Sequence, residues 1–175
     1  MNKLNNKISQ SSLIVIGLLL AGCLVSGTFI ITQSFQFTAQ SGFYFYQVNL
    51  TTEQVWKDHS DKIDFIDAVG VELYITSNEA GNVTFDAYVD NYSGAGSNPS
   101  SVPASATKII DNLTVAPGST KITYAQSLGL ITNLSTLKAL AKVGQFDFYG
   151  TSSGNDGNTF IIDSGKVIVT FSAGY

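Results

Sequence analysis

The chain has 175 residues, of which 13% are charged, and its nine basic residues are all lysines set against 13 acidic residues. The net charge of −4 argues against binding to a nucleic-acid phosphate backbone. A single cysteine excludes an intramolecular disulfide and a cysteine-rich zinc site, and a single histidine, His59, excludes a multi-histidine metal centre. No cofactor or metal is predicted.

The first 23 residues have the form of an export signal. Lysines near the start precede an apolar run over 13–21, and small residues follow it, which is the pattern of a secretory signal peptide. The ending Leu20-Ala21-Gly22-Cys23 resembles the lipobox of bacterial lipoproteins. The resemblance implies removal of residues 1–22 and acylation of Cys23. The mature protein would then be exported and held on a membrane of the cell envelope, the outer one where the host has two.

Two other interpretations of this segment stay open. The run over 13–25 is shorter than the ~20 residues that cross a bilayer, but extended to Ile31 it would serve as an uncleaved anchor. A plain secretion signal with an unmodified Cys23 is the second alternative. Residues 23–175 have a length that suits one domain, so we expect a single lipid-anchored domain.

Alternation of apolar and polar side chains predicts about eight strands in the rest of the chain. They are 29–38, 43–50, 63–76, 83–90, 108–115, 121–124, 145–149 and 159–172. The last is predicted to bend at Ser164-Gly165. Strands 63–76 and 83–90 are predicted to pair as a hairpin, with turns at Pro117-Gly118 and over 155–158.

Two short helices are predicted between these strands. A capping box at Thr51-Thr52-Glu53-Gln54 begins the first, over about 53–60, with Val55 and Trp56 as apolar anchors. Ser135 begins the second, over 135–142, and Gly144 ends it. Residues 91–105 are rich in Asn, Ser, Gly, Ala and Pro, which predicts a long flexible loop.

This pattern predicts an all-β fold. Strands without alternating long helices indicate an antiparallel β-sandwich, most similar to the immunoglobulin and fibronectin type III architectures. The segments 28–37 and 43–46 carry no charge and would be hazardous as unpaired sheet edges, where they would promote self-assembly. They are therefore predicted to be central strands.

Four tyrosines form the candidate binding face. On their strands they alternate with the main apolar set, and tyrosines exposed on a sheet offer stacking surfaces for sugars or a protein partner. The alternative is that both sheet faces are partly buried. The four residues are Tyr44, Tyr46, Tyr74 and Tyr88.

Acidic residues give a weaker signal. Asp58, Asp61, Asp64 and Asp67 recur at every third position, which indicates a solvated acidic surface, with a cation site as the alternative. His59 lies beside Asp58 and could act as a base, but no nucleophile motif accompanies it, so a surface histidine is expected.

The sequence therefore predicts a non-catalytic cell-envelope lipoprotein. Its sandwich domain would bind a protein partner or a surface component, with no role for nucleic acid. The first alternative is a carbohydrate-binding or adhesive surface protein that uses the tyrosines. The second is a hydrolase that acts through carboxylates or His59.

Overall fold

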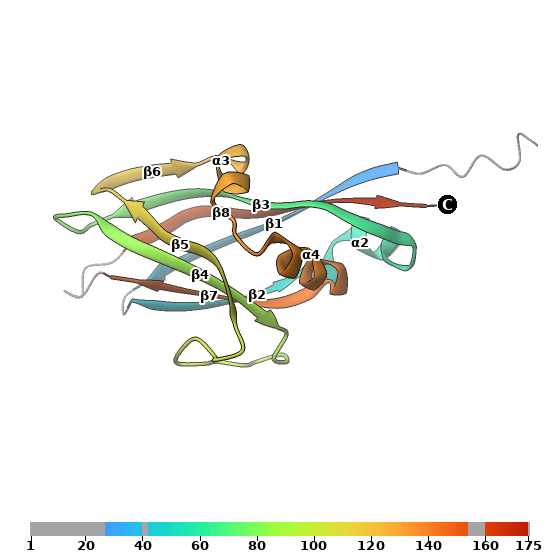
Figure 1. The fold of residues 1–175 in the computed structure, drawn as a ribbon, viewed down its shortest axis with the longest axis horizontal. Coiled ribbons are helices and arrows are strands. Elements are labelled where there is room, and N and C mark those ends of the chain that lie inside the picture. Colours follow the sequence, from blue (N-terminus) through green and yellow to red (C-terminus); the bar gives the residue numbers. More distant parts are fainter. Residues whose placement is uncertain (1–26, 40–41, 154–159, 175) are drawn as a thin grey trace, which may run out of the picture.

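The computed structural model describes residues 27–39, 42–153 and 160–174. Cys23 with the lipobox, and the turn predicted over 155–158, lie outside these ranges. Eight strands form two four-stranded antiparallel sheets that pack face to face as a sandwich, with three short α-helices (Figure 1). The strands are β1 (Gly27–Ala39), β2 (Phe43–Asn49), β3 (Ile63–Ser77), β4 (Val83–Asn91), β5 (Thr107–Val115), β6 (Gly118–Ile122), β7 (Gln145–Ser152) and β8 (Phe160–Ala173).

The strand order is that of a jelly roll. The first sheet runs β1-β8-β3-β6 and the second runs β2-β7-β4-β5, and all neighbours are antiparallel. The chain thus changes sheets at almost every connection, as in double Greek-key jelly rolls. An immunoglobulin sandwich has a different order, with its first two strands side by side. The predicted antiparallel sandwich is confirmed, and its internal order is not the one expected.

The predicted hairpin of 63–76 with 83–90 is wrong. β3 belongs to the first sheet and β4 to the second, so the loop between them crosses the sandwich. Each strand shows clean alternation because each buries one face from its own side of the core, and alternation carries no information about the partner strand. β4 pairs instead with β5 and β7. The Pro117-Gly118 turn likewise connects two sheets, and Gly118 has the positive φ of 83° that such a turn requires.

The prediction that the uncharged segments are central strands is also wrong. β1 is an edge of the first sheet and β2 an edge of the second. The Gln33 side chain on β1 accepts a hydrogen bond from the Asn49 backbone N–H at 3.0 Å, which ties the two strands together. The opposite edges, β5 and β6, carry Lys108 and Lys121, and charge of this kind protects a sheet edge.

Helices α2 (Gln54–His59) and α4 (Leu134–Val143) each contribute to the core. Trp56 of α2 is buried, as are Leu137 and Leu140 of α4. Gly144 ends α4 with a φ of 90°, as predicted, and a Cβ there would lie 2.5 Å from the Trp56 ring.

The helix starts differ from the predictions. The capping box expected at 51–54 is absent, because Asn49 caps a short 3₁₀ turn over Leu50–Thr52. Helix α4 begins after Asn133, which is left-handed (φ 52°), and not at Ser135.

Helix α3 (Tyr124–Leu130) was not predicted. It begins with a complete capping box between Thr123 and Gln126. The helix packs on β3 beyond the point where β6 ends, and Ser127 Oγ accepts a hydrogen bond from the Val71 backbone N–H at 2.9 Å. Gly70 permits this close approach, because a Cβ there would lie 2.7 Å from the Tyr124 ring.

Candidate functional site

The structure does not bring the four predicted tyrosines onto one exposed face. Tyr44 is 7% exposed and its ring stacks in the core on Phe85, with centroids 5.2 Å apart. Tyr46 is half-buried and also faces the core. Tyr74 lies on the outer face of the first sheet and is 42% exposed, whereas Tyr88 is half-buried on the outer face of the second sheet.

Tyr74 forms one wall of an open groove of about 450 Å³ on the first sheet. The groove combines side chains from β3, β6 and the irregular part of β8. Lys121 Nζ lies 5.0 Å from the Tyr74 ring centroid, within reach of a cation–π interaction. Interaction with the Tyr74 side chain raises the pKa of Lys121. The complete lining is Tyr74, Ile75, Ser119, Thr120, Lys121, Asp163 and Ser164.

A bulge in β8 supplies the acidic side of the groove. Opposite Tyr74 and Ile75, the paired residue changes from Ser164 directly to Ile162, so Asp163 is the extra residue. Thr76 Oγ1 donates a hydrogen bond of 2.6 Å to the Asp163 carboxylate, which holds it in place. This irregularity agrees with the bend predicted next to it, at Ser164-Gly165. Bulges of this kind re-aim side chains.

The groove combines an apolar ring with hydrogen-bond donors and acceptors. A tyrosine ring offers an apolar face with a polar rim. A carboxylate accepts hydrogen bonds, an ammonium donates them, and serine and threonine hydroxyls do both. Small-ligand sites typically combine such an apolar surface with a few polar groups in a volume of this size. The sequence singled out Tyr74, but its groove partners come from strands that the sequence could not place beside it.

A second polar cluster on the second sheet has a structural explanation. Lys108 Nζ lies 3.0 Å from Asp86 and 2.8 Å from Asp111. The Asn112 backbone N–H donates a 2.7 Å hydrogen bond to Asp86. Partial burial opposes ionisation of Asp86, but this N–H and Lys108 together lower its pKa. The cluster holds β5 to β4 where Asn112, with a φ of 51°, interrupts their pairing.

Asp147 is fully buried and was not recognised in the sequence. Its carboxylate accepts hydrogen bonds from Gln47 Nε2 at 3.2 Å, the Ser93 backbone N–H at 3.0 Å and the Tyr149 hydroxyl at 3.2 Å. Burial and the Asp147 charge raise the pKa of Tyr149 to about 12. Asp147 therefore fastens the start of the 91–105 loop to the second sheet. The predicted flexibility of that loop stays a prediction.

The regularly spaced aspartates do not converge. Asp58 lies on α2, Asp61 in the 3₁₀ turn Ser60–Lys62, and Asp64 and Asp67 on β3. Within the described ranges, no group of three or more His, Cys, Asp or Glu residues is placed to hold a metal ion. The His59 ring is half-buried and stacks on Phe29, with centroids 3.9 Å apart.

Comparison with known proteins adds little to this geometry. No protein-family model matches the chain, and no curated protein matches it in sequence. Among solved structures, a chain of the infectious bursal disease virus Gx strain is similar, with a TM-score of 0.37 and 12% identity. The match covers 85% of this chain and 37% of the viral one. A match this distant supports no statement about ligand, partner or assembly. In the part of the chain that the structure describes, no helix is both long and apolar enough to cross a bilayer.

Proposed function

We propose that the chain is a lipid-anchored, non-catalytic binding protein of the cell envelope, and that it binds a carbohydrate chain in the Tyr74 groove. The observation that carries the carbohydrate proposal is the groove itself. It places one exposed aromatic ring beside an ammonium, a carboxylate and several hydroxyls on an open surface. The anchor rests on the Leu20-Ala21-Gly22-Cys23 resemblance.

The position of the groove suits an anchored protein. Gly27 is the first residue of β1 and Ile63 is the first residue of β3. Both pair with Ala173, so the two strands begin at the same end of the sandwich. Tyr74 is eleven residues further along β3. At ~3.3 Å per residue in a strand, the groove lies about 35 Å from that end. A ligand in the groove would thus be bound well away from the proposed attachment point.

Retention on immobilised envelope polysaccharide tests the groove. Tyr74→Ala removes the stacking surface, so retention should weaken about twofold to twelvefold, which corresponds to the ~0.5–1.5 kcal/mol of one aromatic contact. Tyr88→Ala is the matched control, because Tyr88 also lies near a lysine, with Lys108 Nζ 5.4 Å from its ring centroid, but does not line the groove. Equal retention of the wild type and Tyr74→Ala rejects the groove as the binding site.

The anchor has a separate test. A clickable palmitate analogue should label the wild-type protein in cells and leave Cys23→Ala unlabelled. Label on the wild type alone supports acylation at Cys23. Absence of label on both proteins rejects the lipid anchor, and a spanning anchor or plain secretion signal takes its place.

A protein partner is the second candidate function. The edge strands β1 and β2 carry no charged residue, and an extended segment of another envelope protein could pair with such an edge. In-cell crosslinking from photoreactive groups on β1 would trap such a partner. Crosslinks that form equally from β5 would argue against specific pairing.

A further inference from the structure

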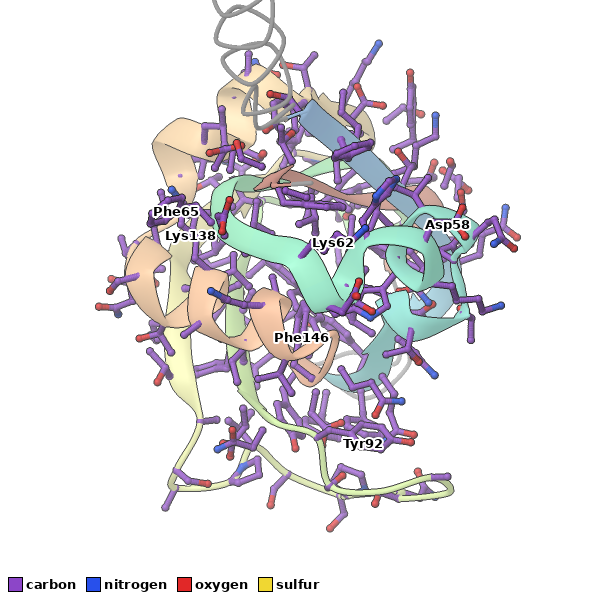
Figure 2. All side chains as sticks on the ribbon, turned by 90° about the vertical axis from the view of Figure 1, so that its right-hand side faces the viewer. Asp58, Lys62, Phe65, Tyr92, Lys138 and Phe146 are labelled. Atoms are coloured by element: carbon purple, nitrogen blue, oxygen red, sulfur yellow. The ribbon has the colours of Figure 1, made fainter. Side chains whose placement is uncertain are left out.

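The most exposed large apolar side chains of the described residues gather at one end of the sandwich. They are Phe65 at 70% exposure, Val143 at 69% and Ile30 at 60%. Ile30 is near the start of β1, and Phe65 is near the start of β3, on the far side of β8. Figure 2 looks directly onto this end, where Phe65 is labelled at the surface.

Val143 joins the other two through the packing of α4. It is the last residue of that helix, and the preceding residue, Lys142, donates a 2.9 Å hydrogen bond from Nζ to the backbone carbonyl of Asp64. The carbonyl of the next residue, Gly144, accepts a hydrogen bond from the Leu50 N–H at 2.8 Å. Three elements that are distant in sequence therefore present apolar side chains at the same end. Isolated exposed apolar residues are normal, but a group at one end marks an interaction surface.

The short segment between Cys23 and β1 indicates what this end of the sandwich would contact. Only three residues separate Cys23 from Gly27, the first residue of β1. Even fully extended, this segment spans no more than about 14 Å between the two Cα atoms. A lipid on Cys23 would therefore hold this end of the sandwich, and not another face, against the membrane.

We propose that this end docks on the lipid surface, with Phe65 and Val143 inserted among the headgroups and Ile30 beside them. The proposal rests on the lipid anchor of the proposed function and adds the surface through which the folded domain meets the bilayer. Apolar side chains on interfacial proteins are buried ~5–10 Å deep, at the boundary between headgroups and acyl chains.

The charges at this end indicate how docking would be driven. Lysines and aspartates are interspersed, and neither sign dominates, so attraction to anionic lipid is not the cause. Binding should instead come from burial of the apolar side chains. The charged residues at this end are Glu53, Lys57, Asp58, Asp61 and Lys62 in and beside α2, Asp64 and Asp67 near the start of β3, and Lys138 and Lys142 of α4. Figure 2 labels Asp58, Lys62 and Lys138 among them.

Tryptophan fluorescence of the full, lipid-modified protein in phosphatidylcholine vesicles tests the proposal. Trp56 is 6% exposed and is present in every variant, so quenching of the wild-type protein gives the background contribution of Trp56. Phe65→Trp and, independently, Val143→Trp place a second indole at the docking end. Tyr74→Trp is the matched control, because it places an exposed indole in the distant groove. Brominated acyl chains quench only indoles that reach the bilayer.

We expect brominated vesicles to quench Phe65→Trp and Val143→Trp beyond the wild type, with emission shifted to shorter wavelength, and Tyr74→Trp to match the wild type. The quenching should be equal in neutral vesicles and in vesicles containing phosphatidylglycerol. Protein that cosediments with vesicles but shows no added quenching at either position overturns docking and leaves the anchor intact. Docking is also overturned if quenching occurs only in anionic vesicles, or if Tyr74→Trp is quenched as strongly as Phe65→Trp and Val143→Trp. Protein that neither cosediments nor takes palmitate label removes the anchor and docking together.

Discussion

Replacement of Gly150 by alanine should destabilise the protein through one identifiable neighbour, Tyr44. The two residues are directly opposite each other in the β2–β7 pair. A Cβ at Gly150 would overlap both Cζ and the hydroxyl oxygen of Tyr44. The tyrosine ring cannot easily retreat, because it is stacked on Phe85 at 5.2 Å and lies 6.2 Å from Phe148.

The magnitude follows from this packing. Overpacking a filled core costs about 1–3 kcal/mol, and the direct overlap puts Gly150→Ala at the upper end, about 3 kcal/mol. Tyr44→Ala should cost about 3–5 kcal/mol through the cavity it leaves. In the double variant the new methyl group enters that cavity. The combined loss should therefore be smaller than the sum of the single losses by about 2–3 kcal/mol.

Equilibrium urea unfolding, followed by the fluorescence of buried Trp56, gives the four free energies of unfolding for this cycle. Gly81→Ala is the control, since a Cβ at Gly81 meets nothing within 4 Å, and its effect should be within ~0.5 kcal/mol of zero. If the losses from Gly150→Ala and Tyr44→Ala add to within ~0.5 kcal/mol, Tyr44 does not occupy the space above Gly150 and the assigned packing is wrong.

Three other perturbations test the polar contacts of the core. Ser127→Ala should lower the free energy of unfolding by about 1–3 kcal/mol, because it leaves the Val71 N–H without its acceptor; an unchanged urea midpoint would contradict this. Tyr149 should still be protonated at a pH where unfolded tyrosine ionises, since its pKa is raised from 10.0 to about 12. Its contribution to stability is complete below pH 10 and is lost as the pH rises towards 12. A spectrophotometric titration that shows no tyrosine ionising late would disprove the assignment. Asp147→Ala removes three hydrogen bonds, and should both destabilise the fold by about 2–4 kcal/mol and speed proteolysis within 91–105. Cleavage there at the wild-type rate would show that Asp147 does not fasten the loop.

The proposed site shows where sequence reasoning stops. Tyr74 was a candidate because its position on a strand alternates with buried residues. Lys121 and Asp163, which share its groove, gave no such signal, since they lie on strands β6 and β8 far along the chain. The same is true of the docking end, because Phe65 and Val143 reach the same end of the sandwich only when α4 packs beside β3.

Local chemistry was enough to place most of the elements. Alternation placed seven of the eight strands close to their observed bounds, and Gly144 marked the end of α4. The strand predicted over 121–124 overlaps β6 (Gly118–Ile122) only at Lys121 and Ile122, because Thr123 and Tyr124 begin α3. Helix α3 was missed because it is short and contains Gly129, although Thr123 and Gln126 have the spacing of the capping box that begins it. Strand and helix signals of this kind depend on neighbours a few residues away, which the sequence contains directly.

The pairing of the strands was decided by the tertiary structure. Alternation shows which face of β1, β2, β3 and β4 is buried, but every core-facing strand satisfies that pattern equally in either sheet. Whether two consecutive strands form a hairpin or lie in different sheets depends on which distant strands pair with each of them. Here β8, the last strand, pairs with both β1 and β3 and separates them. That choice is a property of the whole packed core. It also determines which uncharged strands become edges and which side chains meet around Tyr74.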